Sequence, residues 1–317
     1  FAFFLICAFW QAYDNTIPLI LTNKFGMSQT WSGVIMALDN VLALFMLPLF
    51  GHISDKCTHP RGRRTPFIVV GTLLAAVALI ALSFVDNAQL KHLDKVSAID
   101  DPAALAEIYQ EQKDATLLTP GGESFILGHK FTQEEFTAIR SQISTRSESA
   151  ENDKTVTNPD YTNYVVPARQ ACAHAVTRTH PGTVVLFVVL LLIILISMAT
   201  FRSPAVALMP DVTLKPLRSK ANAVINLMGS AGGILVLALG MVFATSSVRN
   251  SLMSYTGYFG VIAALMLAAL VVFMLTVREP EWAAEMQRQA VAAGLEEAEK
   301  AEHPTESRKL SADEVKS

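Results

Sequence analysis

Two carboxylates interrupt long apolar runs near the start of the chain. Asp14 falls in the run 3–22 and Asp39 in the run 31–52. If both runs are helices, each aspartate lies roughly 12 Å below the same membrane surface, at 1.5 Å per residue. A carboxylate at that depth costs at least about 2.5–3.5 kcal/mol, so it normally faces a cavity or a partner. The pair predicts a polar site near the middle of a bilayer.

Polar and aromatic side chains accompany Asp14 along one helix face. Gln11 and Asn15 recur with Asp14 at steps of three and four residues, and Tyr13 flanks this stripe. Asn226 lies in a later apolar run. Hydrogen bonding between helices is the alternative role for the acids and amides. The predicted substrate- or proton-binding set is Gln11, Tyr13, Asp14, Asn15, Asp39 and Asn226.

Six apolar runs are long enough to cross a membrane. The chain is 51% hydrophobic, but soluble domains are also about half apolar, so the distribution of charge decides the class. About 20 helical residues span a bilayer core of roughly 30 Å. A signal peptide could explain one run but not the others. We predict an all-α membrane protein whose transmembrane helices cover about 3–22, 31–52, 66–85, 183–202, 220–245 and 255–277. The third and sixth, apolar all round, are expected to face lipid.

The cations of the short loops predict the orientation of the chain. Positively charged residues in short loops favour the cytoplasm. Two loops on one side carry Lys56, Arg61, Arg63 and Arg64, and Arg202, Lys215, Arg218 and Lys220. The two short loops on the other side carry only Lys24 and Arg249. Both termini are therefore expected in the cytoplasm, with the protein integral to a bacterial cytoplasmic membrane.

The runs divide the chain into four parts. Residues 1–85 hold helices one to three, 86–182 an extracellular insertion, 183–277 helices four to six, and 278–317 a cytoplasmic linker or tail. Within the insertion, Asp101 before Pro102 predicts an N-cap and a helix over 103–113. Thr132 and Glu135 predict a capping box before a helix over 136–143. The insertion is interpreted as a tolerated, partly disordered loop, because loops accept insertions at small entropic cost; a recognition domain is the alternative.

Composition and motifs argue against several other classes. The net charge of −3 gives no sign of a nucleic-acid partner. Cys7, Cys57 and Cys172 fall in a span and in loops on opposite sides, so neither a disulfide framework nor a metal site is expected. The sequence contains no nucleophile elbow or phosphate-binding loop. We predict that the protein is not an enzyme and has no catalytic residue, metal or cofactor.

The loop between the second and third runs has a spaced set of glycines and charges: Gly51, Asp55, Lys56, Arg61, Gly62, Arg63 and Arg64. This loop resembles the G-x-x-x-D-[R/K]…G-R-R motif of the major facilitator superfamily. The wider segment 51–68, with Pro204, Ala207 and Asp211, is similar to the sucrose/proton-symporter branch. The resemblance implies the N-terminal six-helix bundle of that fold, in which two bundles rock about a central site. It also implies that Asp55 helps to latch the cytoplasmic gate while the arginines hold the loop.

The resemblance implies a function and a partner. Members of the sucrose/proton-symporter branch move sugars or glycosides by proton symport, and sucrose symporters carry an acid in helix four that would fall near Leu195 of this chain. A second six-helix half is the expected partner, and because Phe1 is not Met, the natural start is expected to lie upstream. Two alternatives stay open: an efflux pump for an amphipathic compound, or a membrane receptor or assembly subunit that transports nothing.

Overall fold

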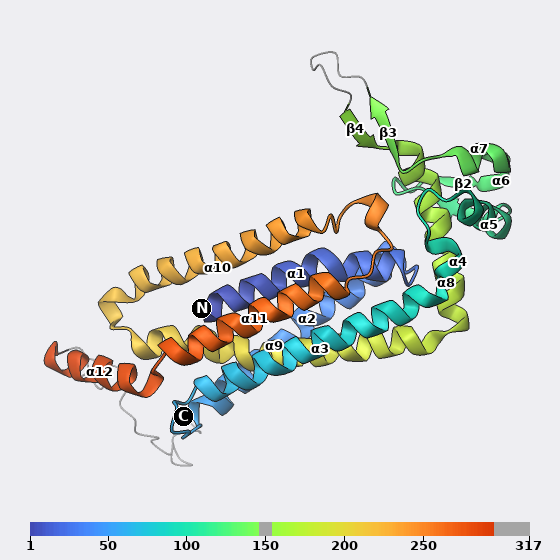
Figure 1. The fold of residues 1–317 in the computed structure, drawn as a ribbon. Helices are drawn as coiled ribbons and strands as arrows, with labels where there is room; N and C mark the ends of the chain where they lie inside the picture. Colours follow the sequence, from blue (N-terminus) through green and yellow to red (C-terminus); the bar gives the residue numbers. More distant parts are fainter. Residues whose placement is uncertain (146–153, 295–317) are drawn as a thin grey trace, which may run out of the picture.

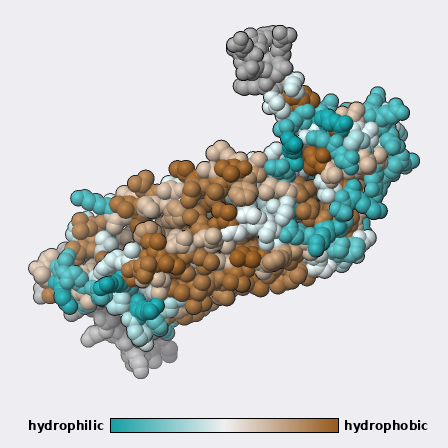
Figure 2. Space-filling view, in the orientation of Figure 1, coloured by the Kyte–Doolittle hydropathy of each residue, from teal (hydrophilic) through white to brown (hydrophobic). Residues whose placement is uncertain are grey.

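The computed structural model describes residues 1–145 and 154–294. Six of its helices are long and apolar enough to cross a membrane, which confirms the predicted fold class. They form one bundle (Figure 1), and an apolar belt covers the visible face of that bundle between two hydrophilic ends (Figure 2). The six helices are α1 (Ala2–Asn23), α2 (Gln29–Asp55), α3 (Thr65–His92), α9 (Pro181–Val212), α10 (Arg218–Val242) and α11 (Thr256–Thr276).

The two ends of the bundle carry different elements. The insertion between α3 and α9 lies at one of them, here called the insertion end, and helix α12 (Glu279–Ala292) lies at the other (Figure 1). The loop 56–64 joins α2 to α3 beside α12, so the second end is called the motif end. Two short 3-10 helices complete the connections, η2 (Lys215–Leu217) at the motif end and η3 (Val248–Asn250) at the insertion end.

Two pairs of helices approach closely because a glycine, which has no side chain, lies at each contact. The most extensive contact joins α3 and α9, where a Cβ added to Gly71 would lie 2.8 Å from the carbonyl oxygen of Ser197. Helices α1 and α10 also pack tightly: a Cβ on Gly232 would lie 2.6 Å from the carbonyl oxygen of Phe4. Small residues permit such approach where lipid offers no hydrophobic force between helices.

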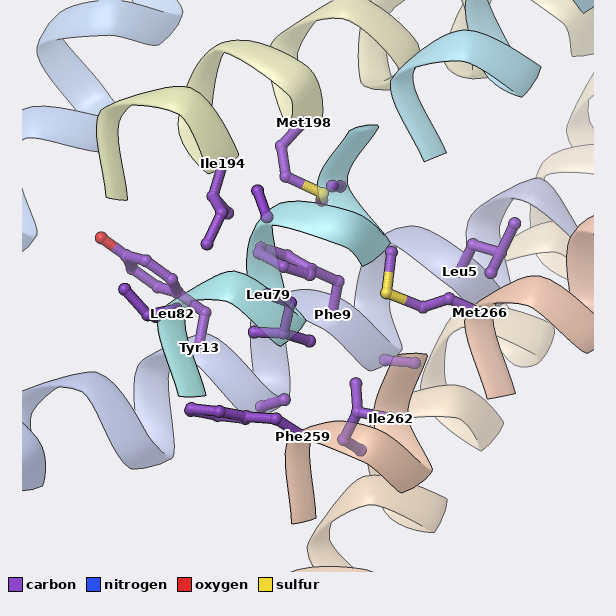
Figure 3. Close-up of a cluster of buried hydrophobic side chains, with 14 of the residues drawn as sticks. Leu5, Phe9, Tyr13, Leu79, Leu82, Ile194, Met198, Phe259, Ile262 and Met266 are labelled. Atoms are coloured by element: carbon purple, nitrogen blue, oxygen red, sulfur yellow. The ribbon is translucent and has the colours of Figure 1, made fainter. Parts of the chain in front are cut away.

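Four helices supply most of the bundle core. Phe9 and Tyr13 of α1 pack with Leu79 of α3, Ile194 of α9 and Ile262 of α11 (Figure 3). All five side chains are buried. This packing holds the face of α1 that carries Asp14 in a fixed direction.

The burial of the helices differs from the sequence expectation. Helix α3, apolar all round, buries about half of its most apolar stretch, whereas α2 buries none of it. The expectation that the third run mainly faces lipid is therefore wrong. A helix that is hydrophobic on every side fits a buried position and a lipid-facing one equally well, so periodicity could not separate them.

Helix α9 is longer than its apolar run. It continues past Arg202 through Pro204 and Pro210 to Val212. Arg202 is therefore a helical residue about 15 Å from the motif end of α9, at 1.5 Å per residue, and the prediction that it lies in a loop is wrong. A charge after an apolar run often marks the end of a membrane helix, but such helices tolerate both charges that face a cavity and internal prolines.

The insertion has a hydrophobic core of its own. Leu105, Ile108, Phe136 and Val165 are fully buried in it, which the interpretation as a partly disordered loop does not predict for these residues. Its elements are α4 (Asp94–Ser97), α5 (Pro102–Gln112), β1 (Thr116–Leu118), β2 (Ser124–Ile126), α6 (Leu127–Lys130), α7 (Gln133–Ala138), β3 (Gln142–Thr145), β4 (Lys154–Thr157), a π-helix (Tyr161–Val165) and α8 (Val166–Thr179).

Local signals predict the caps of the insertion correctly and one helix end wrongly. Asp101 accepts from the backbone N–H of Ala103 at 3.3 Å, and Thr132 and Glu135 form the predicted capping box. The second helix ends at Ala138 rather than at 143, because the following residues pair as strand β3 with β4. Tertiary pairing here overrides the helical pattern.

A buried ion pair joins α1, α3 and the start of α11. Lys24 Nζ lies 2.6 Å from Asp86 Oδ1, and both side chains are fully buried. The same ammonium donates to the carbonyl oxygen of Met253 at 2.6 Å. Lys24, expected from the sequence to be a loop cation, is therefore a structural contact at the insertion end.

Candidate functional site

The polar stripe of α1 lies on the surface of the bundle. Asp14 and Asn15 are exposed and Gln11 is half-buried. Asn15 Nδ2 donates to the backbone oxygen of Gln11 at 2.6 Å, which keeps the amide on the same face as the carboxylate. The stripe is therefore positioned to contact a ligand or a second helical bundle packed against α1.

Asp39 lies across a small cavity from α9. Trp10, Leu195 and Arg202 line this cavity with Asp39, and the Arg202 guanidinium lies 5.6 Å from the centre of the Trp10 ring. Leu195, at the helix-four position where the family acid was expected, thus faces a carboxylate from α2. The structure brings a carboxylate and a guanidinium from neighbouring helices to the lining of this cavity.

Two aromatic side chains add unpaired donors beside the carboxylates. Trp10 Nε1 and Tyr13 Oη are buried and have no hydrogen-bond partner among residues 1–145 and 154–294. The rings pack edge to face with their centres 5.5 Å apart. The ring of Tyr13 belongs to the core (Figure 3), so only its hydroxyl could take part in binding. Buried donors without acceptors are uncommon in proteins, and a bound ligand is one way to supply the acceptors.

The charges of this region are not paired with one another. Within the described part of the chain, Asp14, Asp39 and Arg202 form no ion pair within 4.0 Å. Two ionised acids and one guanidinium sum to −1. One bound proton would make the region neutral, which lowers the electrostatic penalty of a charge inside a membrane.

Asn226 does not join the carboxylates. Its amide donates to the backbone oxygen of Asn222 at 2.9 Å. A Cβ on Gly229, one turn further along α10, would contact Cys7 Sγ of α1 at 2.8 Å. Asn226 therefore lies level with the first turn of α1, roughly 15 Å along the axis from Asp14.

Arg64 organises the charges at the motif end. Its side chain is 5% exposed and donates to Asp55 Oδ1 at 2.5 Å and to Asp211 Oδ2 at 2.8 Å. A third nitrogen donates to Ser54 Oγ at 2.6 Å. Arg63 also pairs with Asp211 at 2.8 Å, from a side chain that is 45% exposed. One buried guanidinium thus joins the ends of α2 and α9 to the start of α3.

A carboxylate from the other end of the sequence caps α3. Glu279 Oε2 accepts from the backbone N–H of Thr65 at 2.8 Å, and Oε1 accepts from that of Arg64 at 2.9 Å. The Thr65 hydroxyl donates to the same carboxylate at 2.7 Å. Gly62 has φ +109, and a Cβ there would clash with the Glu279 side chain. A glycine is therefore required for α12 to dock on this loop.

Replacing Glu279 by Ala should lower the free energy of unfolding by about 1–2 kcal/mol, because two helix-terminal N–H groups would lose their acceptor. Thermal unfolding in detergent measures this change, and faster labelling of a cysteine at Met286 would report release of α12. Glu281→Ala is the matched control, since that exposed acid makes only a 3.4 Å pair with Arg278. Equal unfolding temperatures for the two variants would show that the cap contributes nothing.

The remaining predicted gate residues divide into two groups. Gly51 lies where a Cβ would meet Ser203 Oγ at 3.0 Å, so it supports the contact between α2 and α9. Lys56 and Arg61 are exposed, and their side chains form no ion pair with any described residue.

Sequence reasoning missed two residues of these sites. Arg202 directly follows an apolar run, which is also where a loop cation would stand, so its position gave no sign of a cavity. Glu279 caps a helix that begins 214 residues earlier, and no local pattern identifies such a partner. Among the described residues, no group of three or more His, Cys, Asp or Glu side chains could hold a metal ion.

Comparison with known proteins assigns the family. A family model described as the MFS_1 like family matches residues 9–313. The chain belongs to this family. As an MFS_1 like protein, it is integral to a membrane, and six of its described helices are long and apolar enough to span that membrane.

Short segments of this MFS_1 like protein are similar to plant sucrose transporters. Identity is 37% over 59 residues with Sucrose transport protein SUC4 of Arabidopsis thaliana, covering 19% of this chain and 12% of that protein. It is 39% over 67 residues with Sucrose transport protein SUC3 of the same plant, covering 21% and 11%. The chain thus matches only a small part of the length of these relatives. No solved structure gives a significant match.

Proposed function

We propose that this protein is a secondary active transporter that moves a sugar or glycoside across the cytoplasmic membrane by proton symport. Family membership and the similarity to sucrose transporters support the class. The observation that carries the proposal is the placement of Asp39 and Arg202 at one small cavity beside the Trp10 donor, with Asp14 exposed on the neighbouring helix α1. None of these three charges forms an ion pair with a described residue. Hydroxyl-rich solutes need such acids, amides, aromatic faces and N–H or O–H donors.

Charge balance links the solute to one proton. With both acids ionised the three charges sum to −1, and protonation of Asp14 makes the sum zero. A neutral sugar could then cross with the loaded site uncharged, whereas the unprotonated site would carry a net charge through a region of low dielectric. Asp39 is the alternative proton carrier. Arg202 lines the same cavity, however, and places a positive charge near Asp39.

The proposed orientation places the motif end in the cytoplasm and the insertion outside. The charge of exposed Arg61, Arg63 and Lys56 at the motif end supports it. A second six-helix bundle is the proposed partner, packed against α1, α2 and α10. Large apolar side chains of α2 and α10 are exposed, including Leu44, Phe45, Leu227 and Ile234. In this arrangement Asp14 faces a cavity between the halves.

Reconstituted alone, the chain should give no saturable uptake of sucrose, because only half of the cavity wall is present. A protein that adds six further helices should accumulate radiolabelled sucrose or an aryl glucoside in proteoliposomes with an acidic exterior. Uptake should collapse when a protonophore dissipates the gradient. Robust flux by the isolated chain would refute the need for a second half.

The same vesicles distinguish the competing functions. An efflux pump that exchanges its solute for protons would concentrate an amphipathic dye in the lumen when that lumen is acidic and would leave sucrose untouched. A receptor or assembly subunit would move neither solute under either gradient, even with the second half present. Either result would overturn sugar symport.

A further inference from the structure

Arg169 is a buried cation in the core of the insertion, and its nitrogens have no hydrogen-bond partner among residues 1–145 and 154–294. It lies in the first turn of α8 and its side chain is 4% exposed. Its Nε, Nη1 and Nη2 atoms are all buried, and none has a hydrogen-bond partner among the described residues. A guanidinium has five N–H donors, so an unusually large set of donors is concentrated at one internal point.

A second unpartnered donor lies beside it. Tyr161 is 1% exposed, and its hydroxyl is buried without a hydrogen-bond partner in the described part of the chain. It begins the π-helix that leads directly into α8. Short π-helical segments are rare and occur frequently at functional sites. Burial raises the pKa of the Tyr161 phenol, so this group stays a neutral donor.

The acidic groups around Arg169 and Cys172 make other hydrogen bonds. Asp100 accepts from the backbone N–H and from the hydroxyl of Ser141, both at 2.6 Å. Glu111 makes a side-chain hydrogen bond with Cys172, and burial raises the pKa of that thiol to about 12, so it carries no negative charge. No carboxylate of the described residues lies within 4.0 Å of the guanidinium.

Arg169 cannot lose its positive charge by deprotonation. Burial lowers the pKa of Arg169, but a guanidinium stays protonated in proteins at neutral pH. An isolated charge in a protein core is strongly unfavourable, and buried charges are found paired or hydrogen-bonded. The enclosure of all three nitrogens excludes a large ligand. A small anion would supply both the missing charge and the missing acceptors.

We propose that Arg169 and Tyr161 form a buried site in the insertion for one small monovalent inorganic anion, for which chloride is the probe. The anion would accept from the guanidinium and from the phenol together, and it would link the π-helix to α8. This site is separate from the proposed transport site, and the inference does not depend on sugar symport. A neutral water molecule is the competing occupant, and it would satisfy the donors without the charge.

The test is the thermal stability of the whole chain in detergent, at constant ionic strength, as sodium gluconate is replaced by sodium chloride. A ligand that binds only the folded state raises its stability with concentration. The unfolding temperature should rise by a few degrees along a saturating curve, and bromide should substitute for chloride. Gluconate is too large for an enclosed site and serves as the reference salt.

Three variants locate the effect. Arg169→Met should abolish the chloride dependence, because the apolar side chain removes both charge and donors. Tyr161→Phe should keep the fold and shift the chloride midpoint to higher concentration, which preserves a test if Arg169→Met fails to fold. Arg140→Met removes an exposed arginine of the same domain, which donates to the backbone oxygen of Asp100, and should respond to chloride like the parent. Identical parent curves in the two salts, or an undiminished chloride response in Tyr161→Phe, would overturn the site and favour water.

Discussion

Replacing Asp14 by Asn should abolish accumulation of the solute against its gradient while leaving exchange down a gradient largely intact. The amide resembles the protonated acid in shape and charge, so solute can still bind and cross. It cannot take up or release a proton, so the two fluxes are uncoupled. Substrate accumulation in vesicles of the two-bundle protein under an imposed pH gradient measures this effect.

The expected loss is large because, in the proposed symport, the proton supplies the driving force for accumulation. A membrane potential of about 150 mV provides roughly 3–4 kcal/mol per proton. Each 1.4 kcal/mol corresponds to a tenfold ratio, so a coupled carrier can hold a gradient of a few hundred-fold. Without coupling, the internal concentration should not exceed the external one.

Asp39→Asn is the matched control, since Asp39 lies on the neighbouring helix at similar depth. If Asp14 carries the proton, the Asp39 variant should retain uphill accumulation with altered affinity for solute, through its neighbour Arg202. If the Asp14 variant still concentrates solute like the parent, that carboxylate is structural and the coupling site lies elsewhere.

Replacing Arg64 by Met should lower the free energy of unfolding by about 2–3 kcal/mol. Removal of one partner from a buried charge network usually costs about 3–5 kcal/mol. The expected value is smaller here because Asp55 is 54% exposed and Asp211 keeps its contact with Arg63. Thermal unfolding in detergent measures the loss, and accessibility of cysteines on the two sides of the membrane should show a shifted conformational equilibrium.

Arg63→Met provides a control in the adjacent residue. Both arginines bind Asp211, but the Arg63 side chain is 45% exposed, and surface pairs contribute about 0–1 kcal/mol. Arg64→Lys should behave like the Met variant, because an ammonium cannot reach Asp55, Asp211 and Ser54 in the geometry of a planar fork. Equal stability of the Arg63 and Arg64 variants would contradict the central role given to Arg64.

The membrane class was predictable because a bilayer imposes strong constraints on sequence. Runs of about 20 predominantly apolar residues are rare outside membrane helices, and such runs located all six helices. The ends of helices were less certain: Arg202 and Pro204 look like the start of a loop, yet α9 continues through both. A sequence pattern cannot show that a charge inside a helix faces a cavity.

The candidate sites were predictable only in part. Asp14, Asn15 and Gln11 share a face because helical spacing alone places them there. Arg202 beside Trp10 depends instead on how α9 packs against α1 and α2. The carboxylate of Glu279 and the N–H of Thr65 meet because the chain returns to the motif end after six crossings. Contacts of that kind depend on tertiary structure and leave no local signal.

The pairing of α3 with α9 has a consequence for biosynthesis. These helices share the most extensive contact in the bundle, but residues 93–180 separate them. Ribosomes add roughly 5–20 residues per second, so α3 must wait several seconds for its main partner. During that interval its packing face, including Gly71, stays open to lipid or to chaperones. An insertion with its own core can fold in the meantime, and its completion then brings the start of α9 close to the end of α3. Truncations of the insertion should therefore affect the yield of inserted protein before they affect its activity.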